Sequence, residues 1–96
     1  MFIQTETTPN PLTMKFLPGQ PVLEEGTAFF TSLENARGKS PLAEALFHIK
    51  DVNAVFYGTD FITITKAEDA EWSVIKPAIL TTIMEHYVAQ KPVMVK

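Results

Sequence analysis

Cysteine is absent from this sequence of 96 residues. Without thiols the chain forms no disulfide of its own, offers no thiolate nucleophile and supplies no cysteine ligand to zinc or to an iron–sulfur cluster. Long apolar runs are missing too, since none approaches the roughly 18 residues of a membrane span. The first residues lack the features of a secretory signal or a transit peptide. We therefore expect a soluble chain that works where it is made, with no membrane partner.

Basic residues are few: eight Lys and Arg stand against eleven Asp and Glu, which gives a net charge of −3. They are scattered singly, without a basic arm or stripe. Because nucleic-acid binding begins with cations that neutralise phosphates, we expect no nucleic-acid partner. The length allows one domain with a two-layer core but no large enclosed cavity, which makes an enzyme with a deep pocket a poor candidate.

The N-terminal part predicts a strand hairpin. Residues 2–7 follow a period-two pattern, and residues 13–17 place Met14 and Phe16 on one face of a second strand. Between them lies Thr8-Pro9-Asn10-Pro11, which we call the N-terminal bend. Its two prolines remove backbone donors and restrict the preceding residues, so the pattern predicts a rigid, exposed turn.

Two further regions carry strand patterns. Residues 27–32 predict a third, edge strand, and residues 34–39 read as a polar loop. The strongest hairpin signal joins residues 52–57 to residues 61–66 through the loop at 58–60, which contains a glycine.

Two helices are indicated. Ser40 can cap the first one and Pro41 suits its first position, after which apolar residues recur at spacings of four and three: Leu42, Leu46 and Ile49. The second covers residues 72–89, with an apolar face formed by Trp72, Ile75, Ile79, Ile83 and Tyr87. Pro77 predicts either a kink or a short turn before the main segment.

The element order is therefore β-β-(β)-α-β-β-α. Hairpins give mostly antiparallel pairing, and two one-sided helices need one sheet face to cover. We predict an α+β two-layer sandwich in which a sheet of four to five strands carries both helices on one face.

Candidate chemistry is sparse. His48 follows Glu44 by one helical turn, and His86 is next to Glu85. The sequence contains no histidine spacing that is typical of a metal site. The simpler interpretation is that each histidine lies at the surface or is partly buried, beside a carboxylate neighbour. No G-x-S-x-G elbow and no phosphate-binding glycine loop is present. These patterns favour a binding or accessory module over an enzyme, with no catalytic residue, metal ligand or cofactor on the chain.

Four stretches resemble one known domain. Residues 8–19, TPNPLTMKFLPG, are similar to the TPNPxxLKFxPG opening of the N-terminal domain of the Nfu/NifU-like iron–sulfur cluster scaffold proteins. That domain's other motifs follow in order: SPLA and LF within residues 40–47, VFYG and DFITITK within 55–66, and the W, KP, I and IM of 72–84. The departures are small, namely Leu12, Met14 and Ile75.

The resemblance implies a role in iron–sulfur cluster assembly or delivery. In that family the cluster is held by a CxxC motif in a separate C-terminal domain, which this sequence lacks. We expect residues 1–90 to form the Nfu N-terminal-type domain and residues 91–96 to be a tail or the start of a linker, so that the chain is a domain of a longer scaffold protein rather than a stand-alone relative. The implied location is the cytoplasm of a prokaryote, or the mitochondrial matrix for a processed eukaryotic protein.

The implied role of this domain is recognition of client apoproteins, of iron–sulfur assembly proteins or of its own cluster-bearing domain. Residues of the matching motifs whose types do not belong in a core are the candidate partner-binding residues: Thr8, Asn10, Lys15, Asp60, Lys66 and Lys76. Each also has a simpler structural role, such as Asn10 bracing its own turn. The alternative function is a small metal-binding chaperone or enzyme that uses His48, His86 and carboxylates.

Overall fold

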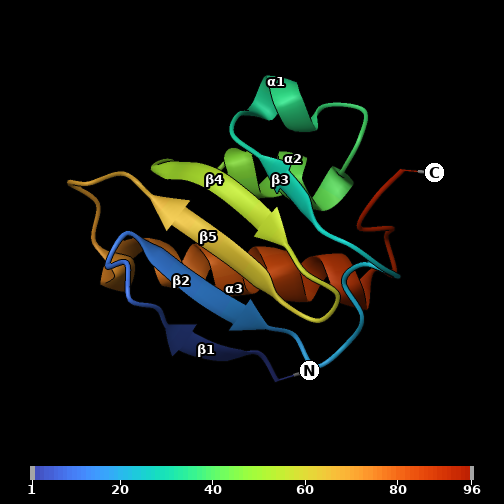
Figure 1. Cartoon of the computed structure of the whole chain (residues 1–96), viewed down its shortest axis with the longest axis horizontal. Coiled ribbons are helices and arrows are strands. Elements are labelled where there is room, and N and C mark those ends of the chain that lie inside the picture. Colours follow the sequence, from blue (N-terminus) through green and yellow to red (C-terminus); the bar gives the residue numbers. More distant parts are fainter. Residues whose placement is uncertain (1, 96) are drawn as a thin grey trace.

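The computed structural model describes residues 2–95. Five antiparallel strands form one sheet in the order β1-β2-β5-β4-β3 (Figure 1). The strands are β1 (Gln4–Thr7), β2 (Thr13–Leu17), β3 (Ala28–Phe30), β4 (Val52–Tyr57) and β5 (Ile62–Lys66). The helices are α1 (Leu33–Ala36), α2 (Pro41–Phe47) and α3 (Trp72–Val88).

One face of the sheet packs against α2 and α3. Cross-strand partners such as Phe16 and Ile62, or Val55 and Ile64, lie on this face, and all four side chains are fully buried. They share one core with buried residues of both helices, namely Leu42, Ala43, Leu46, Ile75, Ile79 and Ile83. Since β-strand side chains alternate between faces, the residues between them point to the other, uncovered side. The predicted α+β two-layer architecture is confirmed.

The structure corrects the sequence interpretation in the segment after β3. Residues 33–36 form the short helix α1 where a polar loop was predicted. The Ser32 side chain caps this helix by accepting the Asn35 N–H at 3.0 Å, and Ala36 is fully buried. A single turn with one buried small residue produces no apolar periodicity, so its sequence resembles a loop.

Helix α3 is continuous through Pro77. The alternative of a separate turn before the main segment is therefore wrong. Proline at this position removes one backbone bond, at a cost of about 3 kcal/mol in a helix interior. Tertiary contacts offset this cost, because the buried Ile75 packs in the core and the Trp72 ring lies 6.5 Å from the Phe16 ring.

Candidate interaction surface

The N-terminal bend is exposed and braced by its own side chains. The Asn10 Oδ1 atom accepts the Leu12 N–H at 2.9 Å, and the Asn10 carbonyl accepts the Thr13 N–H at 3.0 Å. Thr8 donates its hydroxyl to the same carbonyl at 2.9 Å and is also hydrogen-bonded to the Thr13 hydroxyl. Thr8 and Asn10 therefore both stabilise the bend through hydrogen bonds. That they bind a partner stays a prediction.

The bend is also fixed to the rest of the molecule. Trp72 Nε1 donates to the Pro11 carbonyl at 3.1 Å, and the Lys66 N–H donates to the Leu12 carbonyl at 2.8 Å. The Lys66 side chain is only 8% exposed and its Nζ donates to the Ala67 carbonyl at 3.3 Å. Its burial favours the structural role over docking.

The uncovered face of the sheet carries three phenylalanines, which we call the aromatic row: Phe29, Phe56 and Phe61. The Phe56 and Phe61 rings are stacked at 6.1 Å, and the Phe29 ring lies 6.3 Å from that of Phe56. Phe29 is 58% exposed. Lys15 places its Nζ atom 4.4 Å from the centre of the Phe61 ring, within the range of a cation–π contact. An amphipathic, partly solvated strip therefore runs across three strands of this face.

The β4–β5 hairpin holds Phe61 in place. Gly58 donates its N–H to the Phe61 carbonyl at 3.0 Å, and the Phe61 ring packs directly on the glycine. A Cβ atom at position 58 would overlap the ring as it now lies, so glycine allows this close approach, and its φ angle is not the reason. The sequence signal for this turn was the glycine, but its packing role needs the structure.

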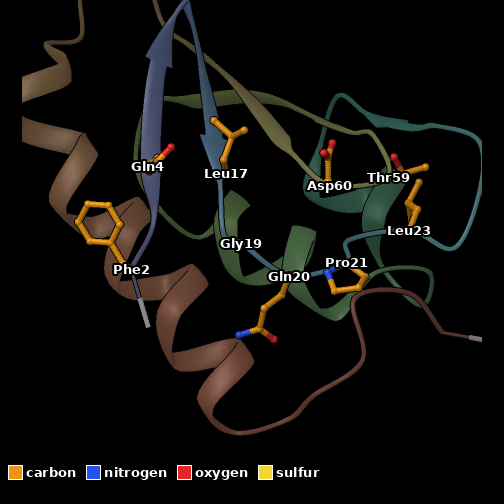
Figure 2. A pocket seen from close by; sticks show the side chains of 9 residues that line it. All are labelled: Phe2, Gln4, Leu17, Gly19, Gln20, Pro21, Leu23, Thr59 and Asp60. Atoms are coloured by element: carbon orange, nitrogen blue, oxygen red, sulfur yellow. The ribbon is translucent and has the colours of Figure 1, made fainter.

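A surface pocket of about 670 Å³ opens at the end of the sheet where β2 ends and β5 begins (Figure 2). We call it the sheet-end pocket. In Figure 2, Phe2 and Gln4 lie at one side of it and Thr59, Asp60 and Leu23 at the other, with Leu17 between them. The full lining is Phe2, Gln4, Leu17, Gly19, Gln20, Pro21, Leu23, Thr59 and Asp60. Within the part of the chain that the structure describes, Asp60 is the one charged residue of this lining.

The structure does not bring the six candidate residues together. Lys15 lies on the uncovered face of the sheet, and Asp60 lines the sheet-end pocket. The bend lies at the opposite end of the sheet, because β2 runs from the bend toward the pocket. Lys76 belongs to α3, in the helix layer. Sequence reasoning missed the aromatic row, although the alternation of Val55, Phe56 and Tyr57 contained the signal that Phe56 faces away from the core.

The two histidines line one groove of about 370 Å³ beside α2 and α3. His86 is 5% exposed and its Nε2 atom lies 2.8 Å from the Pro92 carbonyl, to which it donates. Burial lowers the pKa of the His86 imidazole. Among the described residues, no group of three His, Cys, Asp or Glu side chains is arranged to hold a metal ion.

Helix α3 also exposes apolar side chains on its outer side, among polar ones such as Thr81 and Glu85. Val74 and Val88 are 72% and 71% exposed, and Met84 is 40% exposed. These three exposed side chains are a second candidate docking surface. The apolar periodicity of the helix did not reveal them, because it marks the face that points to the core. Within residues 2–95, no helix has both the length and the apolar character needed to cross a membrane.

Comparison with known proteins gives a consistent picture. Residues 3–90 match the family model described as the N terminus of the scaffold protein Nfu/NifU. The chain is 53% identical over 95 residues to the mitochondrial NFU1 iron-sulfur cluster scaffold homolog of Drosophila ananassae, covering 98% of this chain and 33% of that protein. It is 46% identical over 92 residues to the mitochondrial NifU-like protein 4 of Arabidopsis thaliana, covering 96% of this chain and 32% of that protein.

A solved structure agrees with this result. The solution structure of a NifU-like protein from Saccharomyces cerevisiae superposes with a TM-score of 0.85 at 30% sequence identity, covering 99% of this chain and 85% of that one. The chain spans about a third of the length of the curated relatives that it matches.

Proposed function

The chain belongs to the Nfu/NifU N-terminal family, and on that premise we propose that it is a non-catalytic docking domain of an iron–sulfur cluster scaffold protein. The cluster is the cargo of such a protein. This sequence has no cysteine, so it supplies no thiolate to a cluster. In our proposal the ligands come from a separate CxxC domain, and this chain contributes recognition.

The aromatic row on an uncovered sheet face is the observation that carries the proposal. Helices α2 and α3 cover only one side of the sheet, so Phe29 remains 58% exposed and Phe56 and Phe61 are half-buried. Aromatic residues are enriched in protein interfaces, and contiguous exposed apolar surface marks interaction sites. Lys15 adds a polar handle over the Phe61 ring.

The rigidity of this surface also supports docking. All three phenylalanines lie on or beside strands of the sheet, and Gly58 fixes the position of the Phe61 ring. A surface that is already ordered loses little conformational entropy when a partner binds. The partners we propose are client apoproteins, iron–sulfur assembly proteins and the cluster-bearing domain of the same scaffold. The mitochondrial matrix is the proposed location for a eukaryotic chain and the cytoplasm for a prokaryotic one.

Matched surface variants test this function. We expect Phe29→Ser, and separately Lys15→Glu, to weaken binding of a purified CxxC-bearing Nfu C-terminal domain or an apoprotein client, measured by isothermal titration calorimetry. Val74→Ser on the outer side of α3 is the control, since it removes an exposed apolar side chain from the helix layer and Val74 does not line the sheet-end pocket. Loss of binding in the α3 variant alone would move docking to that helix. Unchanged binding in all three would refute docking through either surface.

A further inference from the structure

We propose that the sheet-end pocket receives a partner segment in which a Lys or Arg side chain is flanked by apolar residues. This inference rests on the proposed docking function and specifies the chemistry of the segment that docks.

The charge in the pocket favours a cationic side chain of the partner. Among the described residues that line the pocket, Asp60 is the one that carries a charge. Among residues 2–95, no ion pair or hydrogen bond engages its carboxylate. It is exposed at the rim, where a cation could reach it without a large desolvation cost. An acidic segment would instead bring like charge to this carboxylate and to a chain whose net charge is −3.

The walls of the pocket favour apolar groups next to that cationic side chain. Four apolar side chains line the pocket, and Phe2 is 78% exposed beside it. A volume of about 670 Å³ is enough for a few side chains, and the apolar stem of Lys or Arg packs well on such walls. The apolar lining residues are Phe2, Leu17, Pro21 and Leu23.

Hydrogen bonds fix the walls before anything binds. The Thr59 carbonyl accepts the N–H groups of Val22 and Leu23 at 2.8 and 3.3 Å, which joins the loop after β2 to the β4–β5 turn. Tyr87 donates its hydroxyl to the Pro21 carbonyl at 3.0 Å and ties the same loop to α3. Asp60 and the wall formed by residues 21–23 are thus held in one arrangement, which lowers the entropy cost of binding.

The pocket is continuous with the uncovered sheet face. Leu17 lines the pocket and lies two residues after Lys15 on β2, so both point to the same side. A segment with its basic residue at Asp60 could therefore extend toward the aromatic row. This continuity favours a polypeptide over a small cation or a free amine.

Three synthetic peptides test the proposal on the whole chain. The probes are acetylated and amidated Gly-Leu-Lys-Leu-Gly, and the same peptide with Gln or Glu in place of Lys. Each is titrated into the isotopically labelled chain while the backbone amide signals of Gly19 and Thr59 are followed by NMR. We expect the Lys peptide to bind about threefold to fivefold more tightly than the Gln peptide, the range that a partly exposed ion pair gives, and the Glu peptide to bind most weakly.

Two variants complete the design. Asp60→Asn should remove the preference for Lys over Gln, whereas Asp69→Asn, the same change at an exposed site near the other end of the sheet, should keep it. Equal binding of the three peptides, or no binding of any of them up to the millimolar range, would overturn the inference. Docking through the aromatic row would then still be judged by the Phe29 variant, so the two proposals can fail separately.

Discussion

The hydroxyl oxygens of Ser40 and Tyr57 lie 2.7 Å apart in the interior of the domain. The Ser40 hydroxyl donates to the Val93 carbonyl at 2.6 Å, so Tyr57 is the donor to Ser40. Ser40 also accepts the Ala43 N–H at 3.1 Å as the cap of α2. One buried side chain therefore joins a helix start, the inner strand β4 and the segment after α3.

Replacing Ser40 by Ala should destabilise the domain strongly. The variant loses a helix cap and leaves the Tyr57 hydroxyl and the Val93 carbonyl without their partner. We expect a loss of about 2 to 4 kcal/mol in the free energy of unfolding, from the cap and the buried unpaired groups together. Urea denaturation measures it.

Ser32→Ala is the matched control, because Ser32 caps the short, exposed helix α1 without a buried partner. It should cost about 0.5 to 1 kcal/mol. If Ser40→Ala and Ser32→Ala lowered the free energy of unfolding by the same amount, the buried hydrogen bonds of Ser40 would contribute nothing beyond helix capping.

His86 should make the stability depend on pH. Burial lowers the pKa of its imidazole below the ordinary value of 6.5, with a smaller contribution in the same direction from Lys91, while the Pro92 carbonyl opposes the shift. Below about pH 6.5 the unfolded chain therefore binds a proton before the folded chain does. The stabilisation is complete above that pH and is lost as the pH falls through the lower folded pKa.

Chemical denaturation between pH 7.5 and pH 5.5 tests this expectation. His86→Gln, which keeps a donor for the Pro92 carbonyl, should flatten the decline in the free energy of unfolding. His48→Gln, the same change at an exposed histidine, is the control. A decline of the same size in both variants would show that other groups cause it.

Sequence reasoning succeeded where the local pattern was sufficient. Strands 13–17 and 52–57 have the predicted bounds, because alternation and flanking turn residues define them locally. The arrangement of the candidate site residues could not be predicted in this way. Asn10 and Asp60 lie at opposite ends of the sheet because β5 inserts between β2 and β4, and that strand order is not contained in any local pattern. The packing of Phe61 on Gly58 likewise needs coordinates.

We expect the isolated chain to retain no iron–sulfur cluster. Such clusters are held mainly by Cys thiolates, and this sequence has none. Anaerobic incubation with ferrous iron and sulfide, followed by desalting, should leave no visible absorption band on the chain. A purified CxxC-bearing Nfu domain treated in parallel should acquire one. A stable chromophore on the isolated chain would favour the alternative of a metal-binding chaperone that uses histidines and carboxylates.

The contact between Gly58 and Phe61 can be tested by adding a single methyl group. Gly58→Ala places a methyl group where the Phe61 ring now packs, and the ring must move. Overpacking of this kind costs about 1 to 3 kcal/mol in the free energy of unfolding. Because the displaced ring also stacks on Phe56 and lies under Lys15, the variant should weaken partner binding as well. The companion change Phe61→Leu isolates the cause: if ring overlap is responsible, Gly58→Ala should cost less in the Leu background than in the native one. Equal costs in the two backgrounds would assign the effect to the backbone of the turn instead.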